Sequence, residues 1–506
     1  MNIAQHLERA VRHFPERTAI IFEGQPISYA ALQAQADRLA HAFSRLGITP
    51  GERITLLLPN IPEFAIAYLA IQKVGAVTVS ANVMLTAEEL RYLVEDSGST
   101  LLVTSSVFAA AWQPLVVDDA LLPAGRVVLV DGGSPEALTL SALIANAPET
   151  PFAARDMNPD APAAILYTSG TTGRQKGATL SHANLVSNTF ATVHLEGITP
   201  DDRLLLFLPL FHVFGQNAIM NSALQAAATI VLQRRYDPLE TPALIERERV
   251  TMLFAVPTIY IGLLNGGLDP RQLESVRYYF SAAATMPVEV ARRWQSIFGR
   301  PIVEGYGLTE TSPFSSYNHI WKHRPGSVGT PIENVEIKVL DPEDREVETG
   351  TWGEICIKGP NIMLGYWNRP TETADAIREG WFHSGDIGYM DADGYIYIVD
   401  RVKDMINSAG FKIWPREVEE VLFQHPAIRE CAVVGLSDPL KGEIPAAFLV
   451  LAEGASLSVE EFDAYCRQHI ASYKVPRHVE FVEALPKNAT GKILKRLLRA
   501  QRAPPC

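Results

Sequence analysis

The sequence predicts an α/β protein with a large N-terminal body and a smaller α+β domain at its C-terminal end. Strand-like apolar runs alternate with stretches of helical spacing through most of the 506 residues, which favours parallel sheets covered by helices. From about residue 330 the pattern changes to short strands joined by turns. A chain of this length corresponds to about three units of ordinary domain size, and its last ~100 residues to one small domain.

The body is predicted to contain two series of alternating elements, enough for two sheet-based subdomains. One helix start is clear because Thr86 and Glu89 have the spacing of a capping box. The first series has strands at Ile54–Leu58, Val77–Ser80 and Leu101–Thr104 and a helix at Pro62–Val74 that stops at Gly75. The second has strands at Ala164–Tyr167, Thr229–Leu232, Thr251–Val256 and Val276–Phe280 and helices at Leu239–Glu248 and Pro287–Phe298.

The C-terminal part is predicted from shorter elements. A second capping box, formed by Ser458 and Glu461, precedes a helix at Phe462–Ile470. We place a domain boundary near residues 400–403, which gives a body of residues 1–402 and a C-terminal domain of residues 403–506. Strands are expected at Val335–Leu340, Gly353–Lys358, Tyr395–Val399, Cys431–Gly435, Ala446–Leu451 and Val479–Val482, and a further helix at Glu417–Gln424.

The net charge of −13 is distributed unevenly. Residues 472–506 contain eight lysines and arginines against Glu480 and Glu483, so this tail carries +6 and residues 1–471 carry −19. A general nucleic-acid binder would normally be basic overall, so we expect no nucleic-acid partner. The basic tail on an acidic body requires a separate explanation.

Composition also bears on cellular location. Cys356, Cys431, Cys466 and Cys506 lack CxxC spacing, which argues against a disulfide framework or zinc cage and fits a reducing cytoplasm. The first 14 residues carry charges throughout and have no apolar core, so we do not expect a signal peptide. No segment reaches the ~18 apolar residues of a membrane span. We therefore expect a cytoplasmic protein, and peripheral contact with a bilayer stays open.

The strongest chemical signal is Ala164–Gly177, where an apolar strand runs into small, hydroxyl-bearing residues. Glycines let backbone N–H groups approach an anion closely, hydroxyls add donors, and a lysine adds positive charge, so the segment suits phosphate groups. It is not a Walker A loop, because Gln175-Lys176-Gly177 replaces the required Gly-Lys-Ser/Thr. The alternative is a plain turn between a strand and a helix. The candidate phosphate ligands are Thr168, Ser169, Gly170, Thr171, Thr172, Gly173 and Lys176.

Tyr167–Gly177 resembles the YTSGTTGxPKG loop of the adenylate-forming superfamily, which includes acyl-CoA synthetases, luciferases and the adenylation domains of peptide synthetases. Further motifs of that superfamily follow in order over nearly the whole chain, and together they look most like those of bacterial fatty-acyl-CoA ligases. These motifs are Leu208–Gly215, Glu304–Glu310, Gly353–Ile355 with Gly365-Tyr366, Ser384–Asp386, Asp400–Asp404 and Pro486–Lys492.

The resemblance implies that a carboxylate attacks the α-phosphate of ATP, giving acyl-AMP and pyrophosphate, and that coenzyme A then takes the acyl group. It implies Lys492, Thr168 and Glu310 as catalytic residues, with Thr168 and Glu310 as ligands of Mg²⁺. Lys492 would bridge the substrate carboxylate and the α-phosphate, and Asp386 would accept both ribose hydroxyls. The nucleotide would also contact Thr168 to Gly173, Lys176, Ala283, Ala284, Glu304, Gly305, Tyr306, Gly307, Thr309, Ile398 and Arg401.

The resemblance also implies a small β-barrel-like part in the body and a mobile C-terminal domain with its hinge at Lys403, near residues 401–404. In this interpretation the basic tail is an electrostatic feature of two domains that close over anionic substrates. Rotation would exchange the face of Lys492 for a coenzyme A channel formed by His212, Ser408, Ala409, Gly410 and Phe411. The acyl pocket would consist of His212, Val213, Ala282, Ala283, Tyr306 and Gly307.

The sequence departs from the usual motifs in two places. Ala282 and Ala283 stand where glycines are commoner and could narrow the acyl entrance, and Gln175 replaces the usual proline. Tyr236-Asp237 looks more like an acyl-CoA ligase than a peptide-synthetase domain, so a fatty or related aliphatic acid is the expected substrate.

Several alternatives stay open. An acyl-AMP ligase that loads an acyl carrier protein usually has an extra segment after the Tyr-Gly-x-x-Glu motif, whereas only Thr311–Arg324 stands here. No carrier domain follows within the sequence, so we expect a free-standing ligase, as a monomer or homodimer. A luciferase-like oxidoreductase and a non-catalytic nucleotide-binding relative are more distant alternatives.

Overall fold

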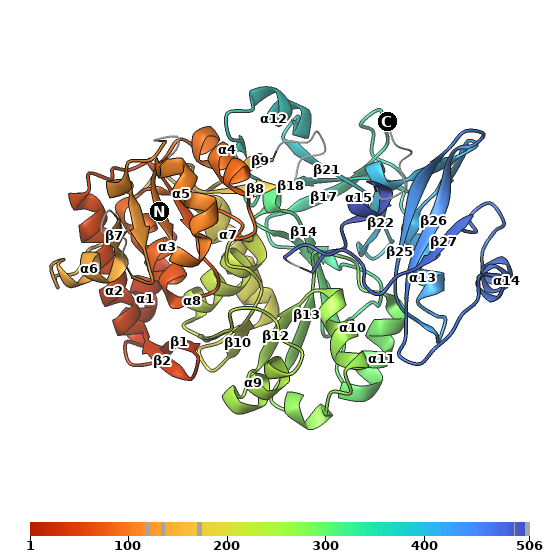
Figure 1. Ribbon diagram of the computed structural model, residues 1–506, viewed down its shortest axis with the longest axis horizontal. Coiled ribbons are helices and arrows are strands. Elements are labelled where there is room, and N and C mark those ends of the chain that lie inside the picture. The colour runs from red at the N-terminus through yellow and green to blue at the C-terminus, as the bar shows by residue number, and fades with distance from the viewer. Residues whose placement is uncertain (118–120, 133–136, 169–174, 490, 501–506) are drawn as a thin grey trace.

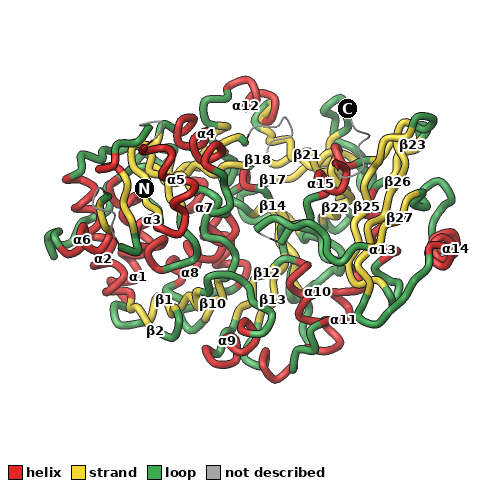
Figure 2. Tube along the Cα trace, viewed as in Figure 1, coloured by secondary structure: helices red, strands yellow, loops and turns green. Residues whose placement is uncertain are grey.

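The computed structural model describes residues 1–500 except 118–120, 133–136, 169–174 and 490. The body fills most of Figure 1, from the red and orange N-terminal elements on the left to the green elements below the centre. The blue C-terminal elements form a separate sheet on the right, and Figure 2 shows the strands of that sheet running side by side along its length. The expected large body and small C-terminal unit are thus both present.

One sheet of the body has eight strands, of which six form a parallel series. The loop after its strand β8 leads into an antiparallel strand, β9, so the alternative of a turn between a strand and a helix is wrong. Residues Tyr167 and Thr168 pair with Gly177 and Lys176 in this hairpin. The strand order is β19 (Gly365–Tyr366), β9 (Lys176–Ser181), β8 (Pro162–Thr168), β4 (Val77–Ser80), β3 (Arg53–Leu57), β5 (Ser99–Thr104), β6 (Val127–Leu129) and β7 (Leu138–Thr139).

The second sheet of the body has nine strands, and its centre is also parallel. The N-terminal hairpin β1–β2 joins this sheet beside β11, about 200 residues later in the chain. The order is β16 (Thr330–Pro331), β15 (Phe314–Tyr317), β14 (Ile302–Gly307), β13 (Tyr278–Ser281), β12 (Met252–Ala255), β10 (Arg203–Leu206), β11 (Thr229–Leu232), β1 (Thr18–Phe22) and β2 (Gln25–Ser28).

Helices cover and separate these sheets. Helix α3 (Pro62–Val74) is buried along almost its whole length, as expected for a helix that is apolar on nearly every face. Thr86 caps α4 through the predicted capping box. The other helices of the body are α1 (Gln5–His13), α2 (Tyr29–Arg45), α4 (Ala87–Ser97), α5 (Ala109–Val117), α6 (Leu140–Ala145), α7 (His182–Glu196), α8 (Ser222–Ala226), α9 (Glu240–Glu248), α10 (Pro257–Asn265), α11 (Val288–Phe298) and α12 (Pro370–Ala376).

Two smaller sheets complete the fold. The first, which corresponds to the expected barrel-like part, is formed by β17 (Glu336–Leu340), β18 (Gly353–Lys358), β20 (Ile377–Arg378), β21 (Trp381–Met390) and β22 (Ile396–Arg401). The second is the C-terminal sheet, formed by β23 (Ile406–Ser408), β24 (Phe411–Ile413), β25 (Ile428–Asp438), β26 (Gly442–Leu451) and β27 (His478–Phe481). Helices α13 (Pro415–Leu422), α14 (Val459–His469) and α15 (Lys495–Ala500) pack against it, and Ser458 caps α14 as predicted.

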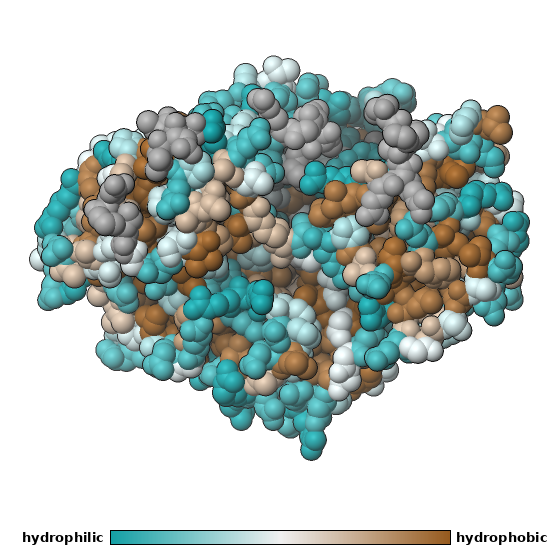
Figure 3. Space-filling model, viewed as in Figure 1, coloured by the Kyte–Doolittle hydropathy of each residue, from teal (hydrophilic) through white to brown (hydrophobic). Residues whose placement is uncertain are grey.

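The surface, the helix lengths and the thiols bear on where the protein could reside. Figure 3 shows hydrophilic and hydrophobic residues interspersed over the visible face. Within the described ranges, no helix combines the length and apolarity that crossing a bilayer requires. Cys356, Cys431 and Cys466 are free and buried.

A buried ion pair ties the N-terminal helices to α3. The ammonium of Lys73, which has no exposed surface, lies 2.7 Å from Asp37 Oδ1 on α2 and 2.7 Å from Glu8 Oε1 on α1. The same ammonium donates to the carbonyl of Phe152 at 2.9 Å. One cation on the innermost helix therefore holds three separate segments of the body.

We predict that Lys73→Met destabilises the body by about 3–5 kcal/mol, because Asp37 would stay buried without its cation. Urea unfolding of the wild type and the variant measures the difference. The double variant Lys73→Met/Asp37→Leu should recover much of the loss, since it removes both charges. Arg234→Met, which breaks an exposed pair with Glu23, should have a small effect. Equal effects of Lys73→Met and Arg234→Met would contradict the prediction.

Candidate active site

Most of the predicted site residues of the body lie at or near the ends of strands. Parallel sheets commonly bind ligands at the carboxyl ends of their strands. Thr168 ends β8, Lys176 begins β9, Ala282 to Ala284 follow β13, Glu304 to Gly307 lie on β14, and Thr309 and Glu310 form the short helix η5 (Thr309–Thr311). Asp386 lies on β21, Ile398 and Arg401 on β22, and His212 and Val213 before the π-helix η3 (Phe214–Asn221). Ser169 to Gly173 lie outside the described residues.

Asp386 links three of these elements. Its Oδ2 accepts a hydrogen bond of 2.7 Å from the hydroxyl of Tyr306, and its Oδ1 lies 2.9 Å from Nε of Arg401. Burial, with the Asp386 charge next in size, raises the pKa of Tyr306 well above its usual value, so this tyrosine stays a donor. Because each carboxylate oxygen can accept two hydrogen bonds, one further acceptor position per oxygen is available to a ligand.

Lys492 is presented to this cluster by a tight turn. Asn488 Oδ1 accepts from the Lys492 N–H at 2.8 Å, and Thr258 of α10 donates to the Gly491 carbonyl at 3.1 Å. Gly491 has a φ of +82°, and a Cβ there would lie 3.0 Å from the Thr258 hydroxyl, so the turn requires glycine. The turn therefore docks the lysine of the C-terminal unit on the body.

The electrostatic surroundings of Lys492 lower the pKa of its ammonium group. The residue is exposed at the turn, but protein atoms around its ammonium displace bulk water. This desolvation, reinforced by Arg401, lowers the pKa of Lys492 to about 8, although Asp386 opposes the shift. Lys492 is thus coupled electrostatically to Asp386 and Arg401.

His212 lies within the electrostatic reach of Lys492 and is held as a neutral ring. Burial, with the Lys492 charge next in size, lowers the pKa of His212 to about 4. Its Nδ1 accepts a hydrogen bond of 3.2 Å from the N–H of Phe214, which places the ring proton on Nε2. His212 can therefore act as a neutral hydrogen-bond donor.

A second cluster joins Glu310 to the phosphate loop through Tyr366. The Tyr366 hydroxyl donates to Glu310 Oε1 at 2.9 Å, and the Lys176 ammonium lies 5.1 Å from the centre of the same ring. Thr168 Oγ1 lies 3.4 Å from the Lys176 carbonyl at the neck of the hairpin. Thr168 and Glu310 are oxygen ligands of the kind that Mg²⁺ prefers, so the predicted pair fits that ion. Tyr366 belongs to the Gly365-Tyr366 motif, but it is not among the site residues that the sequence predicts.

The base of the phosphate loop is fixed by residues that sequence reasoning missed. Tyr167 donates to Asp96 Oδ2 at 2.7 Å, and Arg369 lies 3.2 Å from Asp96 Oδ1. Tyr92 donates to the Gln175 carbonyl at 2.9 Å and accepts from Arg369 at 3.0 Å. These residues come from α4 and the segment after β19, so only the folded chain brings them together. No short motif marked Asp96 or Tyr92.

Glu304, one of the residues expected at the nucleotide, contacts the loop that follows β13. Its Oε2 accepts from the Met286 N–H at 3.2 Å, and desolvation raises its pKa to about 7, against the effect of Arg416. The carboxyl therefore secures the loop that follows β13. In that loop Ala283 has a φ of +70°, a conformation that favours glycine, which explains why glycine is the commoner residue at this position.

Four of the residues predicted for the coenzyme A channel, Ser408 to Phe411, lie in the C-terminal sheet. Ser408 pairs with Gly442 in the C-terminal sheet, and Ala409 and Gly410 form the turn before β24. Phe411 stacks on Tyr473 at 4.9 Å and is exposed. The structure thus brings Lys492, rather than Ser408 to Phe411, to Asp386 and Arg401. Lys403 lies in the short helix η6 (Val402–Asp404) between the two units.

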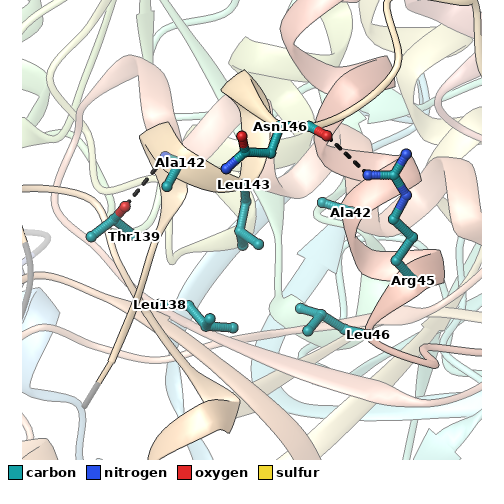
Figure 4. Close-up of a pocket in the computed structure, with 8 residues that line it drawn as sticks. All are labelled: Ala42, Arg45, Leu46, Leu138, Thr139, Ala142, Leu143 and Asn146. Carbon is teal, nitrogen blue, oxygen red and sulfur yellow. Dashed lines mark hydrogen bonds between the residues drawn. The ribbon is translucent and has the colours of Figure 1, made fainter. Parts of the chain in front are cut away.

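Two other features do not belong to this site. A groove of about 230 Å³ lies between α2 and α6 and is lined mainly by apolar side chains. Figure 4 shows these side chains and the hydrogen bond that Arg45 donates to the Asn146 carbonyl. The eight residues that line the groove include none of the predicted site residues. Glu354, Cys356 and His383 form a cluster of metal-ligand type in the sheet of β18 and β21. The Arg378 guanidinium lies 2.5 Å from His383 Nδ1 and 3.9 Å from Glu354. A positively charged side chain of the protein therefore already contacts this cluster.

Comparison with known proteins adds independent findings. The model of the AMP-binding enzyme family matches residues 7–367, and the model of the AMP-binding enzyme C-terminal domain matches residues 417–492. The chain is 36% identical to a long-chain-fatty-acid–CoA ligase of Bacillus subtilis, over 97% of this chain and 93% of the relative. It is also 36% identical to a feruloyl-CoA synthase of an Amycolatopsis species, over 96% of both chains.

A solved structure is similar over the same extent. The crystal structure of ATP-bound MatB from Rhodopseudomonas palustris superposes with a TM-score of 0.91 and 33% identity, and the match covers 99% of both chains. Both the body and the C-terminal unit therefore have counterparts in one known protein.

We predict that Lys492 titrates near pH 8, because its surroundings disfavour the ammonium form. Competitive labelling with acetic anhydride at several pH values, read by mass spectrometry, measures this directly. Acylation of Lys492 should rise through a midpoint near pH 8. Lys412, an exposed lysine of the C-terminal unit, is the internal reference. Identical labelling profiles for the two lysines would contradict the prediction.

Proposed function

The chain belongs to the family of AMP-binding enzymes, and from that premise we propose that it activates a carboxylic acid with ATP and passes the acyl group to coenzyme A. In the first step a carboxylate oxygen bonds to the α-phosphorus of ATP, and pyrophosphate leaves. In the second step the sulfur of coenzyme A bonds to the acyl carbon, AMP leaves with the electron pair of the broken C–O bond, and the thiol proton is released.

The observation that supports this most is the electrostatic coupling of Lys492 to Asp386 and Arg401, which pair with each other. Joining a carboxylate to a phosphate brings negative charges together, so cations must neutralise the developing charge. We assign this work to Lys492, with Asp386 and Tyr306 on the nucleoside and Arg401 next to the ribose or phosphate. Tyr306 would place its ring against adenine while its hydroxyl orients Asp386.

The phosphate chain would lie along the hairpin between β8 and β9. We assign it to the backbone and hydroxyls of Thr168 to Gly173, to Lys176 and to Thr309. Thr168 and Glu310 would hold Mg²⁺, which draws electron density from the phosphate oxygens when bound. The remaining members of the nucleotide set, Ala283, Ala284, Glu304, Gly305, Gly307 and Ile398, would shape the walls around the adenosine.

Two half-reactions at one site explain the two-part chain. We propose that residues 1–402 form the body and residues 403–506 a cap that rotates about Lys403. Lys492 would serve adenylation, and Ser408, Ala409, Gly410 and Phe411 would replace it to form the coenzyme A channel with His212. A short connecting helix with Lys403 at its centre is a suitable joint, because a hinge requires only backbone freedom.

The acid is the part of the proposal that needs the most direct test. We propose a fatty or related aliphatic acid, seated against His212, Val213, Ala282, Ala283, Tyr306 and Gly307, but relatives of similar identity carry names of both fatty-acid and aryl-acid ligases. The neutral state of His212 and the buried Val213 favour an uncharged substrate tail. The free buried thiols suit the reducing cytoplasm in which such a ligase would work.

The function is tested with a panel of aliphatic and aromatic carboxylates in a pyrophosphate-release assay, with and without coenzyme A. Acid-dependent pyrophosphate release followed by acyl-CoA formation supports the proposal. The second candidate, an acyl-AMP ligase for a carrier protein, is less favoured because only Thr311–Arg324 separates its diagnostic motifs. Transfer to a holo-carrier protein and not to coenzyme A would establish that alternative instead.

Lys492→Ala should reduce acid-dependent pyrophosphate exchange about 100- to 1000-fold, because a cation that stabilises transition-state charge is lost. Thioester formation from supplied acyl-adenylate should stay near the wild-type rate, since Lys492 has left the site in that half-reaction. Both rates are measured on the same preparation. Arg496→Ala, which removes an exposed cation of the same tail, is the control. Equal loss of both half-reactions would contradict the division of labour.

Asp386→Ala should raise the KM for ATP roughly 10- to 100-fold, because two hydrogen bonds to the ribose are lost at about 1 kcal/mol or more each. The change is measured in the pyrophosphate-exchange assay with the acid held at saturation. Asp393→Ala, which removes an exposed carboxylate at a turn, should leave this KM unchanged. A wild-type KM in Asp386→Ala would remove this residue from the nucleotide site.

A further inference from the structure

Tyr366 connects two groups that the proposed function uses separately. Its hydroxyl donates to Glu310 Oε1 at 2.9 Å, and its ring lies below the Lys176 ammonium at 5.1 Å. Desolvation and the Glu310 charge raise the pKa of Tyr366 far above its usual range, so the hydroxyl stays protonated and donates. A single side chain therefore contacts both a predicted metal ligand and a predicted phosphate ligand.

The backbone around Tyr366 is fixed to both of these neighbours. The Met363 N–H donates to the Glu310 carbonyl at 2.8 Å, and the Trp367 N–H donates to the Gly177 carbonyl at 2.7 Å. Between them, Gly365 and Tyr366 pair with Thr179 and Ala178 of β9. The segment 363–367 thus forms a strap that joins η5 to the strand that follows the phosphate loop.

The far end of the strap is anchored as well. Trp367 Nε1 and Asn368 Nδ2 both donate to the Asp96 carbonyl at 3.1 Å. The N–H of Tyr366 donates to Thr373 Oγ1 of α12 at 2.9 Å. Tyr366 therefore starts from a backbone that has little freedom to move, which makes the position of its hydroxyl reproducible.

We propose that Tyr366 is a positioning residue that holds Glu310 in the rotamer required for Mg²⁺ and keeps Lys176 alongside it. This inference rests on the proposed function. With Oε1 of Glu310 engaged by the tyrosine, Oε2 is the oxygen left for the ion. Mg²⁺ demands near-ideal geometry, so a carboxylate that is fixed before the ion arrives binds it more tightly. The hydroxyl contacts Glu310 and the ring contacts Lys176, and substitutions can remove the hydroxyl alone or the hydroxyl and the ring together.

The test measures binding rather than turnover. Mn²⁺ binding in the presence of a non-hydrolysable ATP analogue is followed by electron paramagnetic resonance, and binding of the analogue without metal is measured by calorimetry. Tyr366→Phe should weaken Mn²⁺ binding about 10-fold, the size expected when a partner of a metal ligand is lost. It should leave metal-free binding of the analogue unchanged, because the ring under Lys176 remains.

Tyr366→Leu should weaken Mn²⁺ binding similarly and also weaken metal-free binding of the analogue by roughly 2- to 5-fold, because the contact of Lys176 with an aromatic ring is lost. If this variant does not fold, as judged by circular dichroism, Tyr366→Phe alone decides the proposal. A double-mutant comparison sharpens it. In a Glu310→Gln background, Tyr366→Phe should have no further effect on Mn²⁺, since the two residues act as one unit.

Tyr395→Phe is the matched control. Its hydroxyl also donates a hydrogen bond, to the Lys322 carbonyl at 2.7 Å, and its ring also lies below a cation, Arg324, at 4.4 Å. Both binding constants should stay at wild-type values. Wild-type Mn²⁺ affinity in Tyr366→Phe, or equal weakening of metal-bound and metal-free binding, would overturn the proposal. Failure of the wild type itself to bind the analogue would instead contradict the proposed function.

Discussion

The arrangement of this site depends on the carboxylate of Asp386. It accepts from Tyr306 on the nine-stranded sheet and pairs with Arg401 at the end of β22, the last strand before the C-terminal unit. Its charge also opposes the loss of the proton from Lys492, which desolvation of the ammonium and the charge of Arg401 promote. Without this carboxylate, two cations would face each other at the junction of the two units, and the docked turn of Lys492 would be electrostatically unfavourable.

The folded chain shows which carboxylates pair with the cations of the basic tail. Four of its cations pair with carboxylates within about 2.7–2.8 Å: Lys474 with Glu417, Lys487 with Glu430, Lys495 with Glu419 and Arg499 with Asp404. All four partners lie beyond residue 402. Much of the tail charge therefore stabilises the C-terminal unit internally rather than attracting anions. Lys492 is the member of the tail that the turn directs toward Asp386 and Arg401. The interpretation that the tail charge faces anionic substrates therefore applies to Lys492 rather than to the tail as a whole.

Local signals in the sequence predict local structure well, and non-local pairing explains what they miss. Helix α3 and the capped starts of α4 and α14 were predicted because each depends on residues within one or two turns. The hairpin β1–β2 was not predicted, since its place beside β11 depends on a strand far away in the chain. The same holds in the site: the motifs identify Tyr306, Asp386 and Lys492, whereas Asp96 carries no motif and matters only through its folded neighbours.

The described contacts between the body and the C-terminal unit include hydrogen bonds and one aromatic pair, Trp352 with Trp414, whose ring centres lie 6.2 Å apart. Thr258 donates to the Gly491 carbonyl at 3.1 Å, and the Val288 N–H donates to Glu420 at 3.4 Å. Arg416 of α13 interacts with the buried Glu304, whose pKa of about 7 means that it titrates near neutrality. Hydrogen bonds of this kind exchange with water at small cost. This part of the interface therefore suits the rotation that we propose for a cap serving two half-reactions.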